Sequence, residues 1–464
     1  MQLVAYGAQD VYLTGQPKVT FFQAVYKRHT NFAMENIQQT VNGSPTNGGR
    51  VSVTIARNGD LVGNMYVALQ PTQLNFSNLT STNGNVDTCW VAERAIAAVE
   101  LTIGGQRIDK HYQTWFRLYA EVFLGESDKI AYGKMASSPT PGTDNNNRNY
   151  VYLPLLFFFN RNPGLYLPLI ALQYHEVRLD FDLTSYYTDY FGTNAFEVWA
   201  NYVYLDTEER RRFAQKGHEY LIEQVQHTGG DAVTATSSAP SPAAQTIRLS
   251  FNHPVKELIW CFSNTSASAR NSMWNFSTSC ANVNVTCGAS PMTYGGVMPH
   301  EIGCPRLYSN VLVGPITGLA VATQALAIVT PMSNVYWVEE GTANTTIATT
   351  AGAFSAMEVG PLYNFKLVLN GQDRFKEQVG KYFNQYQPFL YHTGTPYVGI
   401  YAYSFALQPE EHQPTGTCNF SRIDNAQVAL NMKANYTTPQ MKMFAVNYNI
   451  LRIQSGMGGL AFSN

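Results

Sequence analysis

The sequence predicts an all-β protein of two related antiparallel β-sandwiches, with short helices and long loops. Its 464 residues exceed what one hydrophobic core usually organises, so two domains are expected. Apolar residues make up 45% and charged residues 13%, with 29 Tyr and 25 Phe, which is typical of a sheet-rich globular protein. Short alternating segments are separated by Gly, Pro, Asn and Asp turns without a βαβ rhythm, and this favours antiparallel sandwiches.

Two stretches of sequence occur twice, in the same order along the chain. Residues 32–39 resemble residues 219–226, and residues 100–107 resemble residues 366–373. Each copy of the second stretch is an alternating strand that ends in a Gly-Gln turn. Self-similarity in a fixed order marks repeated units, so we predict a duplicated β domain.

Alternating apolar residues predict the individual strands. From Val177 to Leu183 every second residue is apolar. On a strand these side chains share one face, whereas on a helix they would scatter around the axis. The same pattern predicts strands at residues 51–55, 247–251 and 398–407.

Two helices are predicted after the Gly-Gln turns. Between residues 109 and 123 apolar side chains fall at helical spacing, and Asp109 could cap the first turn. A weaker pattern predicts a helix over residues 372–383. Each segment contains an aromatic pair, Trp115-Phe116 in the first and Tyr382-Phe383 in the second.

The boundary between the two domains is expected near residues 206–218. There a strand-like stretch gives way to the charged segment Asp206 to Arg212, and a new strand is expected from Tyr220. Residues rich in Gly, Ser, Pro and Asn predict long loops at 137–148 and 228–245. The expected division is an N-terminal arm (1–25), a first domain (26–212), and a second domain with long outer loops and a C-terminal segment (213–464).

The charge of the chain gives no basis for nucleic-acid binding. The formal net charge is −2 and the pI about 6.5, whereas phosphate-binding domains usually carry a basic excess or stripe. The densest basic run, Arg210 to Arg212, follows Glu208-Glu209 and is expected to be a solvated segment rather than a phosphate clamp. No direct nucleic-acid partner is predicted.

No segment predicts a signal peptide or a transmembrane helix. Residues Met1 to Gly7 lack a basic region followed by a long apolar core. Residues 307–338 contain no charged residue, but Pro315 and Pro331 interrupt them and Ser, Thr and Asn are frequent. A sheltered loop with one or two strands is therefore favoured over a membrane span.

The residue types that carry chemistry stand in no recognisable arrangement. The nine histidines never form an HxH pair, and Glu410-Glu411, like the other acidic pairs, stands in a predicted turn where solvated charges are expected. The six cysteines include no CxxC pair. Buried free thiols are expected, although Cys280 and Cys287 could pair across a loop. No catalytic residue, metal site or cofactor is predicted.

Asn-x-Ser/Thr triplets are the one signal for covalent modification. Several lie in the long insert of the second domain, where exposed loops are expected. The candidate N-glycosylation sites there are Asn264, Asn275, Asn284 and Asn344.

Longer blocks, spread over the whole chain, are specific enough to indicate a family. They are residues 3–15 (LVAYGAQDVYLTG), 26–32 (YKRHTNF), 103–112 (IGGQRIDKHY), 168–177 (PLIALQYHEV), 369–375 (LNGQDRF), 416–425 (GTCNFSRIDN) and 455–460 (SGMGGL). These blocks resemble the major capsid proteins of nucleocytoplasmic large DNA viruses, and the chlorovirus-like phycodnaviruses look nearest. The resemblance is weakest from residue 264 to residue 360.

This resemblance implies a fold and an assembly. The fold is two consecutive eight-stranded antiparallel jelly rolls in each chain. The assembly is a homotrimer of nearly hexagonal outline that tiles the icosahedral capsid of a large double-stranded DNA virus, formed in the host cytoplasm. Second-domain loops would face outward, with sugars attached by viral enzymes. Met1 to Phe22 would face minor capsid proteins and an internal membrane, or would instead form an ordinary edge strand or arm of the first domain.

The expected function is therefore structural and not enzymatic: a capsid subunit that acts by self-association. The alternative is a secreted or surface carbohydrate-binding β-sandwich, which would stay small and bind sugar in solution. A jelly-roll enzyme of the cupin kind comes third, and it would need a histidine-based metal site that the sequence does not offer.

Overall fold

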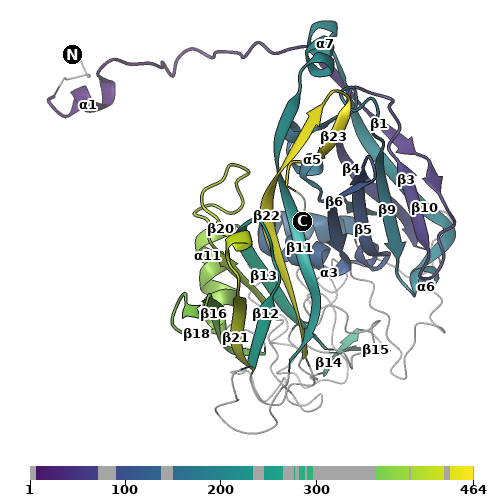
Figure 1. Ribbon diagram of the computed structural model, residues 1–464, viewed down its shortest axis with the longest axis vertical. Coiled ribbons are helices and arrows are strands. Elements are labelled where there is room, and N and C mark those ends of the chain that lie inside the picture. Colours follow the sequence, from purple (N-terminus) through teal and green to yellow (C-terminus); the bar gives the residue numbers. More distant parts are fainter. Residues whose placement is uncertain are drawn as a thin grey trace.

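Two β-sandwiches lie side by side, and an N-terminal arm runs away from them (Figure 1). The computed structural model describes residues 7–71, 90–136, 150–233, 245–264, 276, 282–287, 290–295, 361–394, 396, 399–432 and 439–462.

The first sandwich, here called the first jelly roll, is formed by sheets A and B. Sheet A runs in the order β1 (Phe32–Gln39), β10 (Phe191–Leu205), β4 (Leu61–Pro71) and β7 (Val151–Pro154), with β8 (Leu167–Pro168) paired to β4. Sheet B runs in the order β2 (Val41–Asn42), β3 (Arg50–Thr54), β9 (Val177–Leu183), β5 (Ile96–Ile103) and β6 (Gln106–Tyr112).

The second jelly roll is formed by sheets C and D. Sheet C runs in the order β11 (His218–Ala232), β22 (Pro439–Gln454), β13 (Pro254–Asn264) and β19 (Ile400–Ser404), with β20 (Cys418–Asn419) and β23 (Met457–Leu460) added at β13 and β22. Sheet D runs in the order β12 (Gln245–Leu249), β21 (Ala426–Met432), β16 (Leu362–Leu369) and β17 (Gln372–Asp373), with β18 (Gln378–Val379) paired to β16. A separate hairpin joins β14 (Asn282–Cys287) and β15 (Ser290–Gly295).

The two jelly rolls have the same topology. Their main strands in chain order are β1, β3, β4, β5, β6, β7, β9 and β10, and then β11, β12, β13, β16, β17, β19, β21 and β22. Numbered from one to eight in each set, sheets A and C both run 1-8-3-6, and sheets B and D both run 2-7-4-5. The prediction of two consecutive eight-stranded antiparallel jelly rolls is thus confirmed.

The hairpin turns give a physical reason for part of the sequence repeat. Gly104-Gly105 joins β5 to β6, and Asn370-Gly371 joins β16 to β17; all of these residues have positive φ. Two-residue hairpins of this kind fit the right-handed twist of their strands and require Gly or Asn. The repeated turn is therefore a constraint on the backbone at equivalent places in the two jelly rolls.

Helices connect the strands. They are α1 (Asp10–Thr14), η1 (Val91–Arg94), α3 (Gln113–Phe123), α4 (Glu126–Ala136), α5 (Phe158–Arg161), η2 (Pro163–Leu165), α6 (Tyr187–Tyr190), α7 (Thr207–Gln215), the π-helix η3 (Tyr382–Tyr386), α11 (Gln387–Tyr391) and η4 (Phe420–Arg422).

Both helix predictions were correct in place but wrong in their bounds. Asp109 lies in β6 opposite Leu101, and Tyr112 is the residue at the N-cap of α3, so the predicted Asp109 cap was wrong. Residues 372–373 and 378–379 pair with β16, and helical residues begin only at Gly380. In both cases pairing with a neighbouring strand satisfies backbone groups that the sequence pattern had assigned to a helix.

The charged segment at the domain boundary forms a helix. Asp206 stands at the N-cap of α7, and its carboxylate accepts a hydrogen bond from the Thr207 N–H. Glu208 and Glu209 occupy the first turn, where the helix dipole favours acidic groups. The loop expected at 228–245 was partly wrong, because β11 extends to Ala232; the loop expected at 137–148 lies outside the described residues.

The central strands of sheet C, β22 and β13, are buried on both faces. Phe444, Val446 and Ile259 belong to the hydrophobic cluster that fills the first jelly roll. Met443 and Trp260, one residue along their strands, belong to the cluster between sheets C and D. Because successive side chains of a strand point to opposite faces, one sheet serves both cores. The two jelly rolls are thus joined by packed apolar side chains.

Candidate functional site

The features that could carry function are contacts and surfaces. Within the described residues, no group of three or more His, Cys, Asp or Glu is placed to hold a metal ion. In that same part of the chain, no helix is long and apolar enough to span a bilayer. The candidate sites are the contact between the two jelly rolls, here called the joint, and the exposed apolar surfaces.

At the apolar part of the joint, helix α3 packs on the outer face of sheet C. The ring centroids of Trp115 and Phe444 lie 5.6 Å apart, and those of Tyr112 and His227 lie 5.0 Å apart. Trp115 is only 2% exposed. Three aromatic residues follow one stripe of this helix at a spacing of four, and we call them the first row: Trp115, Tyr119 and Phe123.

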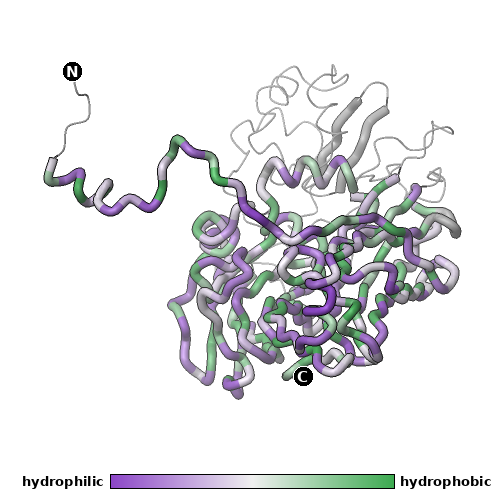
Figure 2. The backbone as a smooth tube through the Cα atoms, turned by 90° about the horizontal axis from the view of Figure 1, so that it is seen from above, coloured by the Kyte–Doolittle hydropathy of each residue, from purple (hydrophilic) through white to green (hydrophobic). Residues whose placement is uncertain are grey.

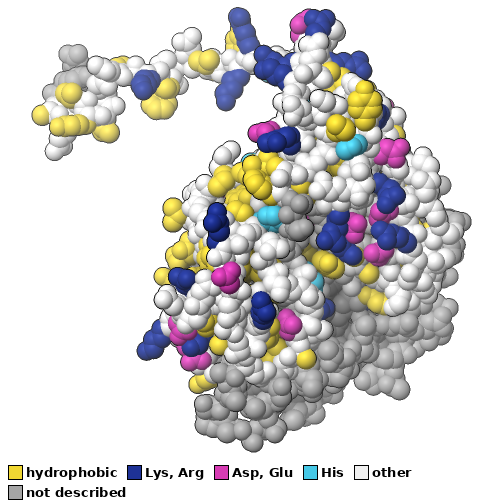
Figure 3. All heavy atoms as spheres, viewed as in Figure 1, with side chains coloured by type: hydrophobic (Ala, Val, Ile, Leu, Met, Phe, Trp, Pro, Cys, Tyr) yellow, Lys and Arg dark blue, Asp and Glu magenta, His cyan; other side chains and the backbone are white. Residues whose placement is uncertain are grey.

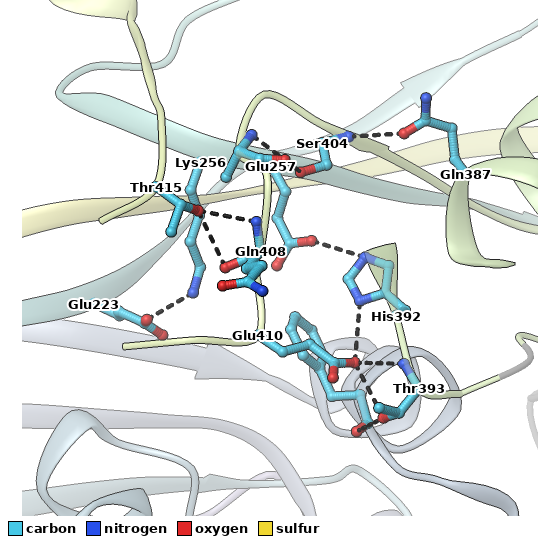
Figure 4. Close-up of polar contacts among 12 residues, drawn as sticks. Glu223, Lys256, Glu257, Gln387, His392, Thr393, Ser404, Gln408, Glu410 and Thr415 are labelled. Atoms are coloured by element: carbon cyan, nitrogen blue, oxygen red, sulfur yellow. Dashed lines mark hydrogen bonds and ion pairs between the residues drawn. The ribbon is translucent and has the colours of Figure 1, made fainter. Parts of the chain in front are cut away.

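A buried ionic group crosses the joint. Glu223 of β11 accepts hydrogen bonds from Lys256 of β13 at 2.6 Å and from Arg161 of the first jelly roll at 2.9 Å (Figure 4 shows the Glu223–Lys256 contact). Burial alone would raise the pKa of the Glu223 carboxyl, but the charges of Arg161 and Lys256 outweigh it and hold the pKa below its usual value. The ionised carboxylate is therefore the stable form.

A second ionic group lies beside the C-terminal end of α3. The His392 side chain is 1% exposed and lies between two carboxylates, with Nε2 at 3.1 Å from Glu257 and Nδ1 at 3.4 Å from Glu410 (Figure 4). Burial opposes protonation of His392, but the charges of Glu257 and Glu410 raise its pKa to about 9. The ring also meets Phe123 of α3 edge-on at 5.3 Å, and the Thr393 hydroxyl donates to the Phe123 carbonyl at 3.3 Å.

The C-terminal hairpin adds backbone contacts across the joint. The Tyr174 N–H donates to the Gly456 carbonyl at 3.0 Å, and the Leu460 N–H donates to the Gln106 side chain at 3.1 Å. Residues from both jelly rolls thus share polar as well as apolar contacts along the joint.

The helical segment of the second jelly roll carries the same kind of aromatic stripe, but exposes it. We call Tyr382, Tyr386 and Phe389 the second row. The rings of Tyr382 and Tyr386 stack with centroids 5.5 Å apart. Tyr386 is 52% exposed and Phe389 is 82% exposed. Figure 3 shows hydrophobic side chains gathered over this side of the second jelly roll.

The outer face of sheet A is a second apolar surface. Phe32 and Met34 of the edge strand β1 are half exposed, and Tyr152 of β7 is more than a third exposed. Trp199 of β10 is partly exposed on the same face, since its neighbours Val198 and Ala200 point into the core. Tyr66 of β4 lies against Tyr152, with centroids 5.7 Å apart.

The N-terminal arm is exposed along its length. Figure 2 shows it leaving the body, with hydrophobic and hydrophilic residues mixed along it. Tyr12, Phe21 and Phe22 are each more than nine-tenths exposed, and Lys18 lies among them. Large aromatic groups left in water in one chain are typical of a segment that is covered by a partner.

The candidate glycosylation sites are only partly described. Asn264 is the last residue of β13, and Asn284 lies in β14 opposite Thr293. Asn275 and Asn344 lie outside the described residues, as do Cys280 and the segment 307–338. Cys261 and Cys418 are free thiols.

The sequence interpretation missed the polar part of the joint. Glu410 lies exposed in a turn, as expected, but it also pairs with His392 and accepts a hydrogen bond from the Thr393 N–H. These contacts lower the pKa of Glu410 against the opposing effect of burial. Glu257 and His392 are 135 residues apart in sequence, and no local motif signals that they meet. Arg210, in the basic run, pairs with buried Asp60 at 2.9 Å.

Comparisons with known proteins cover the whole chain. The family model described as "Major capsid protein N-terminus" matches residues 20–206, and that described as "Large eukaryotic DNA virus major capsid protein" matches residues 209–459. The major capsid protein of Paramecium bursaria Chlorella virus 1 is 42% identical over 495 aligned positions, covering 100% of this chain and 99% of the relative. That of Phaeocystis pouchetii virus is 38% identical with the same coverage.

A solved structure agrees with these relatives. A chain of the PBCV-1 virus capsid, from a quasi-atomic model, aligns with a TM-score of 0.69 and 38% sequence identity. The alignment covers 96% of this chain and 100% of that chain. These similarities favour a capsid protein and give no support to the carbohydrate-binding alternative.

Proposed function

Because the chain belongs to the family of major capsid proteins of large eukaryotic DNA viruses and is a structural subunit of the virion capsid, we propose that it works as a homotrimer. Two jelly rolls of the same topology in each chain would place six similar units around one axis. A nearly hexagonal capsomer of this kind can tile an icosahedral shell edge to edge. The proposal assigns the chain no enzymatic role, since its relatives are structural proteins.

The observation that carries the proposal is the shared topology of the two jelly rolls. A jelly roll packs two sheets face to face and leaves few free strand edges, so it can stand beside its neighbours without polymerising through open strands. Stable contacts between obligate subunits bury roughly 2,000–5,000 Å² and are rich in apolar groups. The exposed second row and the outer face of sheet A offer apolar surface of this kind.

We also propose the division of the chain into an arm (1–25), a first jelly roll (26–212) and a second jelly roll with outer loops and a C-terminal segment (213–464). Helix α7 lies between β10 and β11, and the two family models meet between residues 206 and 209. Asn264, Asn275, Asn284 and Asn344 stay candidate N-glycosylation sites, which glycopeptide mass spectrometry of the native protein decides one by one.

The trimer is tested by the mass of the purified native protein in solution. Light scattering on a sizing column should give a species near three times 51.6 kDa that does not change on dilution. The reason is that an obligate interface of this size dissociates too little to be seen at ordinary protein concentrations. A clean monomer would contradict the proposal.

The partner proposed for Met1 to Phe22 is a minor capsid protein beneath the shell. The exposed aromatic groups of residues 12–22 support a docking role, and Lys18 provides a reactive amine within that segment. Amine cross-linking of intact virions followed by mass spectrometry should join Lys18 to a different protein of the particle. Cross-links from Lys18 only to copies of this chain would contradict a minor capsid protein as the partner of this segment.

A further inference from the structure

We propose that the second row of each chain docks on the outer face of sheet A of a neighbouring copy, and so repeats between chains the contact that the first row makes with sheet C within a chain. This inference rests on the proposed trimer and names the surfaces that form it.

The helical segments are equivalent parts of the two jelly rolls. Strands four and five of each form a hairpin with a positive-φ turn, at Gly104-Gly105 and at Asn370-Gly371. The helix that follows begins with an aromatic pair in both, Trp115-Phe116 and Tyr382-Phe383. Phe116 and Phe383 are both buried in their own jelly roll, which leaves the neighbouring stripe to face outward.

Within the chain, the outward stripe of α3 is covered. Trp115 contacts Phe444 and Phe123 contacts His392, both residues of the second jelly roll. Trp115 is received by sheet C, where Phe444 is fully buried and Val446 nearly so. Phe123 instead meets His392 in the segment that follows α11. The joint therefore shows that the first residue of such a row packs on the outer face of a 1-8-3-6 sheet.

Sheet A is the equivalent of sheet C in the first jelly roll, and its outer face is exposed. Strand β10 takes the place of β22, β4 that of β13, and β7 that of β19. The outer face presents Phe32, Met34, Trp199 and Tyr152. The strand registers place Trp199 where sheet C has Val446 and Tyr152 where it has Ala402, and both of these residues are buried in the joint. The same chain thus exposes an aromatic row on its second jelly roll and a sheet face that could receive such a row on its first jelly roll.

One chain cannot bring these two surfaces together, but a ring can. The row and the face are different patches, so their contact is heterologous and relates one copy to the next. A rotation relates the first jelly roll of a chain to the second, and another relates the second jelly roll to the first jelly roll of the next chain. If these two rotations are equal, six rotations of about 60° bring three chains into a closed ring. This geometry selects a second copy of this chain as the occupant of both surfaces.

The repeated sequence stretches locate a pair of residues that should face each other between chains. In the joint, Tyr112 at the start of α3 meets His227 of β11. The alignment of residues 32–39 with 219–226 places Thr40 where His227 lies, and the paired aromatic residues place Val379 where Tyr112 lies. Val379 and Thr40 are both exposed in the single chain.

The first test is chemical cross-linking of the full chain carrying Val379→Cys together with Thr40→Cys. Treatment of the assembled protein with a short bis-maleimide should produce covalent dimers and trimers on a denaturing gel. The two single variants and the wild-type chain, which carry the native cysteines, are the matched controls and should stay at the mass of one chain. A double variant that behaves like its controls would overturn the proposal.

The second test is the mass in solution of Phe389→Asp, with Leu407→Asp as the control. Leu407 is also a large exposed apolar residue of the second jelly roll, but lies outside the second row. Phe389→Asp should weaken association by roughly 100-fold, the size of a central hot spot, while Leu407→Asp keeps the mass of the wild type.

The outcomes separate this inference from the proposed function. A trimeric wild type with a trimeric Phe389→Asp variant and no cross-link would overturn the assigned surfaces and leave the trimer standing. A monomeric wild type would overturn both. Because the cross-link is read in a chain whose second row is intact, it also decides the matter if Phe389→Asp does not fold.

Discussion

Replacing Glu223 by glutamine is expected to lower the free energy of unfolding by about 3–5 kcal/mol, the usual cost of removing one partner from a buried ionic group. Glu223 is the only carboxylate within ion-pair distance of both Arg161 and Lys256 among the described residues. Its loss leaves the Lys256 ammonium, with a side chain only 2% exposed, without its counter-charge. A neutral amide does not supply the negative charge of the carboxylate, so the contact between the two jelly rolls loses stability.

Urea unfolding of the full chain at one fixed protein concentration measures this change. Glu219→Gln is the matched control, because Glu219 lies on the same strand and pairs with Arg452 at 2.8 Å, but both side chains are more than half exposed. An exposed pair contributes about 0–1 kcal/mol, so this control should unfold close to the wild type. Equal losses in the two variants would mean that burial of the group contributes nothing.

The second large effect is a loss of stability at alkaline pH that depends on His392. Its folded-state pKa of about 9 lies above the ordinary value of 6.5. Since the group is protonated more readily in the folded state, its contribution is complete below pH 6.5 and is lost as the pH rises through 9. The shift corresponds to about 3 kcal/mol of stability.

The groups around His392 make this titration separable from others. The facing charges are Glu257 from β13 and Glu410 from the loop after β19, while α3 contributes the uncharged ring of Phe123. Burial lowers the pKa of His227 and of His412, so these rings lose their protons below this range of pH. Burial raises the pKa of the Cys261 thiol to about 12, so its ionisation in the unfolded chain lowers stability only above about pH 9. The part of the decline that is absent from the His392→Gln chain is therefore assigned to His392.

Urea titrations at pH 6.5, 8 and 9.5 test the assignment. The His392→Gln chain should be less stable than the wild type at pH 6.5, because Glu257 is buried without a cation, and should show little further decline. His29→Gln is the control, since His29 lies in the exposed segment before β1, and it should follow the wild type at every pH. A wild-type stability that is flat over this range would refute the role given to His392.

The sequence predicted the parts of the fold that depend on local pattern. Alternation from Val177 to Leu183 predicted β9, and all four apolar residues are buried. The repeated strand and turn before Trp115 and Tyr382 predicted a duplicated domain because a two-residue hairpin needs Gly or Asn at its centre. These signals are short in range, so a single sequence is enough to show them.

What the sequence could not predict depends on contacts between distant residues. Asp109 looked like a helix cap, but its carboxylate accepts the Val225 N–H from the other jelly roll at 3.1 Å. Glu410 looked like a solvated charge, and the loop that carries His392 makes it part of the joint. Tyr386 and Phe389 of the second row lie beyond the helix predicted at 372–383, and only the comparison with the buried row of α3 draws attention to their exposure.

Sheet C has a mechanical consequence. Sheet C contributes side chains to both hydrophobic cores, so it cannot bend without exposing buried side chains of one core to water. Each methylene group exposed in this way costs about 0.8 kcal/mol. The angle between the two jelly rolls of a chain is therefore fixed when the chain folds. Differences in curvature between the flat facets and the vertices of a shell must be taken up at the seams between subunits, where loops and arms can adjust.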